Sequence, residues 1–137
     1  MSSANSIQDA LALAGRVLIA WLFIPEGLHQ ATSFAGTAGY IASKGLPLAE
    51  VAVVASIVAH VLLGLAVLLG WQARWAALGL AIFVAVITPI FHNYWALPEA
   101  QQTMQKFMFN KNLAIVGGLL LVTAFGAGGW SLDARKR

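Results

Sequence analysis

The sequence contains no cysteine, and only 9% of its 137 residues are charged. Without a thiol the chain cannot exchange disulfides by itself, so a redox role would require a bound cofactor, a quinone or a partner protein. Soluble domains usually contain about 25% charged residues. The scarcity of charge therefore excludes an ordinary soluble fold.

Apolar residues make up 60% of the chain, and they form long runs separated by short clusters of charge. This pattern is typical of a protein that crosses a membrane several times. A helix of about twenty residues, rising about 1.5 Å per residue, matches a hydrocarbon core of about 30 Å. We therefore expect four transmembrane helices, at about residues 9–28, 51–70, 75–95 and 112–130.

The first of these spans is interrupted by Arg16 and Glu26. Its alternative is a helix lying in the plane of the membrane interface. A span is the better interpretation, because each of the two charged side chains can reach one membrane surface by snorkelling.

The connections complete the predicted fold. Residues 32–47 contain three glycines and are too short and polar to cross a membrane, so a short interfacial helix is expected at about 34–43. Residues 96–110 are interpreted as a polar loop with an amphipathic turn, whereas residues 72–74 force a tight antiparallel hairpin. The predicted class is all-α, a four-helix transmembrane bundle with an interfacial helix between spans 1 and 2, in one domain (residues 1–137).

The basic residues predict the orientation of the bundle in the membrane. Four spans place both termini on one side, and that side carries Arg16, Arg74, Arg135, Lys136 and Arg137. The other side carries Lys44, Lys106 and Lys111. The excess predicts cytoplasmic termini. Apart from the last three residues these cations are scattered singly, which argues against a nucleic-acid partner and leaves the lipid bilayer as the expected surroundings.

Two histidines lie within predicted spans. His60 shares a helical stripe with Ser56 and two small residues, so it should face protein. It then either bonds a neighbouring helix or contacts a ligand. His92 follows Pro89, which bends the third span, and it either points inward or belongs to an interfacial aromatic belt.

A polar cluster is expected near one membrane face. Glu26 and His29 are three residues apart, so they share one face of the first helix. Antiparallel packing brings them to the depth of the third and fourth spans' polar residues, and Glu26 is expected to pair with Lys111. Polar groups within a bilayer are costly, so their convergence marks a candidate ligand site. The predicted ligand contacts are Glu26, His29, His60, His92, Asn93, Trp95, Lys111 and Asn112.

Several ordered blocks resemble the DoxX family of small bacterial inner-membrane proteins. The blocks are GRVLIAWLFIPEGLHQ, GYIASKGLP, LLGWQARWAALGLAIF, IFHNYW, FNKNLAIVGGLLL and GGWSLD. The resemblance implies a four-helix transmembrane bundle, related in outline to the small DoxD-like subunit of thiosulfate:quinone oxidoreductase. It also implies a multi-pass protein of the bacterial inner membrane with a role in quinone-linked redox metabolism. One departure is His60, which stands where the family commonly has an acidic residue.

The first functional hypothesis is a subunit or accessory factor of a membrane redox system, with redox partner subunits and no built-in cofactor. It would bind a quinone or another apolar ligand in the periplasmic half of the bundle, between donors such as imidazole and ammonium groups. The residues do not decide whether the protein is an enzyme.

Two alternatives remain open at this point. One is a non-catalytic scaffold or lipid-handling protein, and the other is metal or haem binding through His29, His60 and His92. Gly117, Gly118 and residues 126–129 are compatible with a homo-oligomer or with packing inside one bundle.

Overall fold

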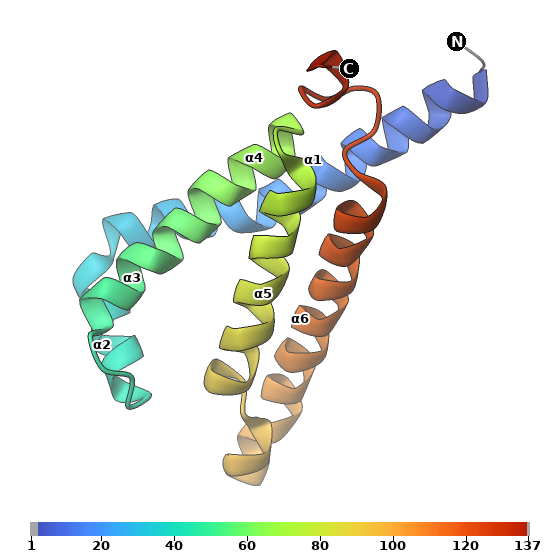
Figure 1. Ribbon diagram of the computed structural model, residues 1–137. Helices are drawn as coiled ribbons and strands as arrows, with labels where there is room; N and C mark the ends of the chain where they lie inside the picture. Colours follow the sequence, from blue (N-terminus) through green and yellow to red (C-terminus); the bar gives the residue numbers. More distant parts are fainter. Residues whose placement is uncertain (1–2, 137) are drawn as a thin grey trace.

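Figure 1 shows the computed structural model, which describes residues 3–136. Within this range all regular structure is helical, and four helices are long and apolar enough to cross a membrane. Both chain ends lie at the same end of the molecule, called here the terminal end (Figure 1). The predicted all-α bundle of four transmembrane helices is confirmed.

The first two crossings are joined by a short helix. Helix α1 (Ser3–Thr32) is followed at once by α2 (Phe34–Ser43), which matches the helix predicted at 34–43. The second crossing is built from α3 (Ala49–Val58), the π-helical turn η1 (Ala59–Leu63) and α4 (Gly64–Leu69).

The third and fourth crossings are α5 (Ala73–Phe91) and α6 (Glu99–Phe125). They are connected through the 3₁₀ turn η2 (Tyr94–Ala96), and a second 3₁₀ turn, η3 (Ala134–Lys136), lies in the C-terminal tail.

The third span runs to Ala96, close to the predicted end at residue 95, but its α-helical part, α5, stops at Phe91. The backbone leaves helical geometry at His92, whose φ and ψ are −125° and 39°. Histidine, asparagine and the aromatic residues that follow are modest helix formers, and Pro89 has already removed one helical hydrogen bond.

The polar loop predicted at 96–110 is wrong from residue 99 onward, where α6 begins. Pro98 precedes the helix, Glu99 is favourably placed near its positive N-terminal end, and the following residues are mostly good helix formers. The same helix also ends early, at Phe125, because Gly126 has a φ of 86° that turns the chain away.

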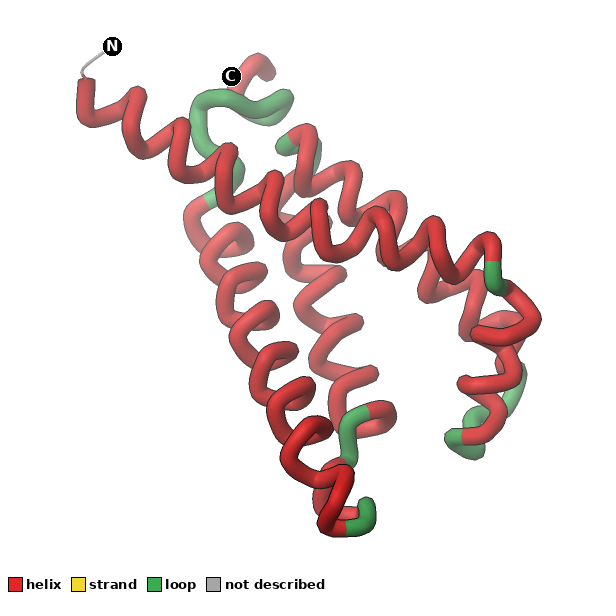
Figure 2. The backbone as a smooth tube through the Cα atoms, turned by 180° about the vertical axis from the view of Figure 1, so that it is seen from behind, coloured by secondary structure: helices red, strands yellow, loops and turns green. Residues whose placement is uncertain are grey.

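The helices form two pairs. Helix α1 packs along α3, η1 and α4, whereas α6 packs along α5. Figure 2 shows the two pairs close together near the hairpin between α4 and α5 and diverging toward the opposite end of the molecule, called here the open end. Contacts of α5 with α4 and η1 hold the pairs together.

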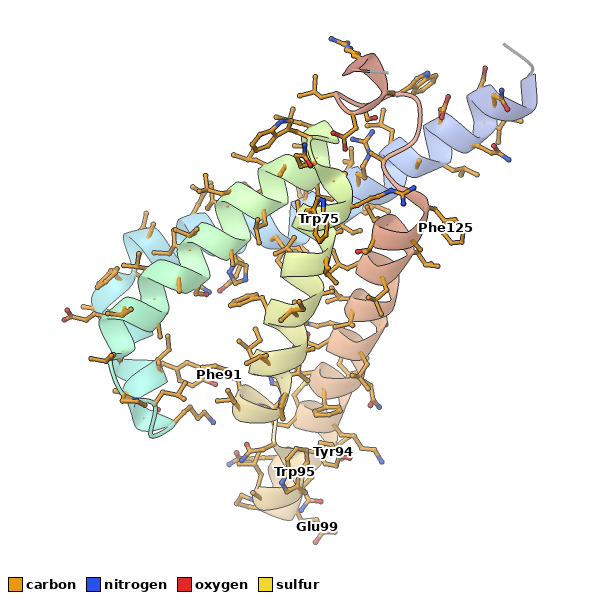
Figure 3. All side chains as sticks on the ribbon, in the orientation of Figure 1. Trp75, Phe91, Tyr94, Trp95, Glu99 and Phe125 are labelled. Carbon is orange, nitrogen blue, oxygen red and sulfur yellow. The ribbon has the colours of Figure 1, made fainter. Side chains whose placement is uncertain are left out.

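The core between the two pairs is built from one aromatic ring and from small and aliphatic side chains, namely Phe23, Ala66, Val67, Ala76, Ala77, Leu80, Ala81, Val84 and Leu119. Large apolar side chains elsewhere face outward, as with Trp21 and Phe125, which are 78% and 79% exposed. Figure 3 shows Phe125 pointing away from the bundle. Such an outer surface suits lipid, because water would penalise so much exposed apolar area.

Arg16 does not snorkel to the membrane surface as expected. It is only 1% exposed, and its guanidinium donates hydrogen bonds to the carbonyl oxygens of Leu68 at 2.8 Å and Trp130 at 2.6 Å. Leu68 belongs to the last turn of α4, where carbonyls lack helical partners and the helix dipole favours a cation. Arg16 therefore joins α1, α4 and the C-terminal tail.

The C-terminal tail is held against the hairpin between α4 and α5. The backbone amides of Leu132 and Asp133 donate to the carbonyls of Leu69 and Gly70, at 3.1 Å and 2.9 Å. The Asp133 carboxylate in turn accepts from the amides of Gln72 and Ala73, at 2.8 Å and 2.9 Å, at the start of α5. It thus satisfies amides that have no partner within the helix.

We predict that Asp133→Ala lowers the free energy of unfolding by about 1 kcal/mol, the usual cost of losing a helix cap. The measurement is unfolding of the purified protein by SDS in mixed micelles, followed by circular dichroism. Asp133→Asn is the control, because its amide oxygen still accepts one of the two hydrogen bonds, and it should show a smaller loss. Equal stability of Asp133→Ala and the unmodified protein would contradict this cap.

Candidate functional site

A cavity of about 810 Å³ lies between the two helix pairs, on the side of the open end. Its walls come from α1, α2, α3 and η1 on one side and from α5 and α6 on the other. Its volume lies within the range of small-molecule sites, about 300–1,000 Å³. Leu22 and Tyr40, 42% and 52% exposed, are part of the lining, so the cavity opens to the surroundings of the bundle.

The shape of the cavity follows from where the helices touch. At Gly27 α1 approaches η1 so closely that an added Cβ would lie 2.7 Å from the Cβ of His60. Beyond this point the pairs diverge, and the rings of Tyr40 and Phe91 meet across the gap at 5.6 Å between centroids. Figure 3 shows Phe91 pointing from α5 toward α2. Close packing at one end and aromatic contact near the other thus enclose the cavity.

A chain of hydrogen bonds runs along one wall. Gln30 donates through Nε2 to Glu26 Oε1 at 3.0 Å, and its Oε1 accepts from the Ser56 hydroxyl at 2.7 Å. The backbone carbonyl of Ser56 lies 2.8 Å from Nδ1 of His60. Side chains from α1, α3 and η1 are thereby joined into one network that faces the cavity.

The opposite wall is tied together by hydrogen bonds between α5 and α6. His92 Nδ1 lies 2.8 Å from Gln105 Oε1. Asn112, only 8% exposed, donates to the hydroxyl of Thr88 at 3.0 Å, and that hydroxyl donates to the carbonyl of Val84 at 2.6 Å. These bonds order the wall, because polar groups inside a bilayer require protein partners.

The expected ion pair between Glu26 and Lys111 is not formed. Both residues line the cavity, but Glu26 accepts from Gln30, and the Lys111 ammonium lies 3.5 Å from the sulfur of Met108. The two charges come from opposite helix pairs, and the divergence of the pairs separates them. Lys111 therefore keeps donors that can reach a molecule in the cavity.

The structure brings together six of the eight predicted site residues as lining of this cavity: Glu26, His29, His60, His92, Lys111 and Asn112. Asn93 and Trp95 are not part of the lining. Trp95 is 57% exposed and packs against the rings of Tyr94 and Phe109. The cause is the end of α5 at Phe91, after which the chain beyond His92 leads away from the cavity (Figure 3).

The polar wall also contains a residue that the sequence analysis did not single out, Gln30. Its position four residues after Glu26 places both on one helix face, and this spacing could have identified it. The sequence placed Ser56 on one helical stripe with His60, and in the structure its hydroxyl and its carbonyl both take part in the network.

The three histidines are not gathered into one cluster that could hold a metal ion. Across residues 3–136, no group of three or more His, Cys, Asp or Glu side chains is arranged to hold a metal ion. His60 is held by Ser56, and His92 by Gln105, on opposite walls. The described part of the chain therefore gives no support to a metal site built from His29, His60 and His92.

Comparison with known proteins places the chain among small membrane proteins. The DoxX family model matches residues 11–93. The chain is 35% identical over 129 residues to inner membrane protein YqjF of Escherichia coli K12, covering 94% of each chain. It is 30% identical to inner membrane protein YphA of the same organism, covering 96% of this chain and 94% of the relative.

More distant relatives are longer proteins. The Surfeit locus protein 4 homolog of Drosophila melanogaster is 27% identical, with 97% of this chain aligned to 43% of that protein. No solved structure matches the chain. With four apolar helices and two near full-length inner-membrane relatives, the chain is a multi-pass inner-membrane protein that belongs to the DoxX family.

Proposed function

We propose that this protein binds a quinone-like amphiphile in the cavity between its two helix pairs, as a subunit or accessory factor of a membrane redox system. The observation that supports this proposal is the cavity itself, about 810 Å³ in volume and open at its side. If the basic residues orient the termini to the cytoplasm, the cavity lies in the periplasmic half of the membrane.

The cavity offers the two environments that such a ligand requires. Apolar side chains such as Leu22, Ile87 and Ile115 can cover an isoprenoid-like tail, which leaves through the side opening into the lipid. A headgroup would lie between the polar network near Glu26 on one wall and the ammonium of Lys111 on the other. A scaffold needs no cavity of this size, so ligand binding accounts for the structure better.

The proposal is tested by filling the cavity. Ala52 lines it from α3, whereas Ala85 is exposed on α5 and is not part of the lining. Ala52→Phe and Ala85→Phe are therefore a matched pair, with the same added ring inside and outside the cavity. Each protein is purified from native membranes, and its copurified quinones and lipids are extracted and measured by mass spectrometry.

We expect the unmodified protein and Ala85→Phe to retain quinone near one per chain, and Ala52→Phe to retain at least about tenfold less, because the ring occupies the cavity. Melting curves in detergent confirm that both variants remain folded. Equal quinone content in all three proteins, or none in any, would contradict the proposal. With an intact bundle, that result favours the scaffold.

A further inference from the structure

One of the two most buried polar residues that line the cavity is His60, which lies in the π-helical turn η1. It is 7% exposed and lies between the rings of Phe23 and Phe83, with centroids at 5.6 Å and 5.2 Å. A π-helical turn inserts one extra residue into a helix and is often found at functional sites. Here it places a histidine ring in the wall of the cavity.

The hydrogen bonds of His60 determine which nitrogen carries its proton. Nδ1 lies 2.8 Å from the carbonyl oxygen of Ser56, and a carbonyl can only accept, so Nδ1 carries the hydrogen. The Ser56 hydroxyl donates its own hydrogen to Gln30 Oε1. In the neutral ring Nε2 is consequently a lone-pair acceptor.

This acceptor has no donor within the described part of the chain. Nε2 of His60 takes part in none of the side-chain hydrogen bonds there, which for this residue involve Nδ1 alone. In that part of the chain, the side-chain nitrogen and oxygen atoms that are both fully buried and without a partner are Arg16 Nε and Asn93 Oδ1. Nε2 of His60 is not among them, so it keeps some accessible surface. Since His60 lines the cavity, Nε2 is reachable from there.

The network on this wall contains a second acceptor, Glu26, and the network's donors already have partners: the Gln30 amide donates to Glu26 and the Ser56 hydroxyl donates to Gln30. The Glu26 carboxylate can only accept, and one of its oxygens is already bonded to Gln30. A headgroup that presents a carbonyl to this wall would place oxygen lone pairs against the lone pair of Nε2. A headgroup that presents a hydroxyl would satisfy it.

We propose that His60 Nε2 accepts a hydrogen bond from a hydroxyl group of the ligand, so that the cavity prefers the reduced, quinol form of a quinone over the oxidised form. This inference rests on the proposed function and adds to it the chemical state of the headgroup. A headgroup that fills the cavity shields Nε2 from other donors, and an acceptor left unpaired in this way is costly enough to separate the two forms by at least about tenfold in affinity.

The test compares the two forms on the full-length protein in lipid nanodiscs. Decylubiquinol and decylubiquinone are titrated separately under anaerobic conditions, and binding is followed by the intrinsic tryptophan fluorescence. We expect the dissociation constant of the quinol to be at least about tenfold lower. In His60→Phe, which keeps a planar ring without nitrogen, this preference should fall to about twofold or less through weaker quinol binding.

Ala85→Phe is the control, since it adds the same ring on the outer surface and should keep the preference. If His60→Phe does not fold, the ratio of the quinone and quinol dissociation constants of the unmodified protein is the test of this inference. Binding of both forms with equal affinity, or tighter binding of the quinone, would overturn this inference and leave the proposed function standing. Binding of neither form would overturn both.

Discussion

Arg16→Met is expected to lower the free energy of unfolding by about 2–5 kcal/mol. The unmodified guanidinium donates to the carbonyls of Leu68 and Trp130, and also lies 3.5 Å from the carbonyl of Val67. Methionine fills similar space but donates nothing, so these carbonyls lose their hydrogen-bond partner around a side chain that is only 1% exposed. The measurement is SDS unfolding in mixed micelles.

Arg74→Met is the matched control for this variant. Arg74 is exposed at the start of α5 and forms no side-chain hydrogen bond within residues 3–136, so removing its charge should change stability by less than about 0.5 kcal/mol. Arg16→Lys should fall between the two, because one ammonium cannot replace the spread of a guanidinium. Similar stabilities of Arg16→Met and Arg74→Met would show that the buried guanidinium does not hold the tail.

Gly27→Val is expected to destabilise the protein by about 1–3 kcal/mol and to displace His60. An added Cβ at Gly27 would lie 2.7 Å from both His60 Cβ and Val61 Cγ2, and 3.3 Å from the Val61 backbone nitrogen. None of these atoms is the far end of a flexible side chain, so α1 must move away from η1. The same unfolding titration measures the loss, and quinone retention measures the displacement.

Gly15→Val is the control on the same helix. A Cβ at Gly15 would have nothing within 4 Å, so valine there should change stability by less than about 0.5 kcal/mol. Comparable losses at the two positions would show that the contact between α1 and η1 does not explain the effect of Gly27→Val.

The predicted and observed ends of the fourth span show what hydropathy can and cannot detect. A search for apolar runs finds the part of α6 that suits a bilayer, from about residue 112 onward, but it does not detect the polar first turns that start at Glu99. Those turns are helical because of residue propensity and a favourable N-terminus, which are independent of apolarity. The end at Phe125 depends on the left-handed backbone of Gly126.

Arg16 illustrates a different limit. Its partners Leu68 and Trp130 are 52 and 114 positions away along the chain. The sequence shows a charge within an apolar run, but it does not distinguish between two ways of stabilising that charge. The side chain can snorkel to the membrane surface, or it can cap another helix. The choice depends on how α4 and the tail are placed around α1.

Some features of the candidate site could be predicted from the sequence, and others could not. Six of the predicted residues line the cavity, because helix length and antiparallel order already determine the depth of each side chain in the membrane. The contribution of Gln30 and the exclusion of Trp95 depend on contacts between helices and on where α5 ends. The depth of a side chain in the membrane follows from its position along one helix, whereas the direction in which it faces depends on how two helices pack.

The sequence by itself determined the bilayer as the solvent, the number of spans and the short helix at 34–43, because these follow from local composition and length. Only the tertiary structure decided that the pairs diverge, that Arg16 is buried, and that His60 is left with a free acceptor in the wall of a cavity. The physical reason is that each of these features arises where backbones far apart in sequence meet, as Gly27 meets η1.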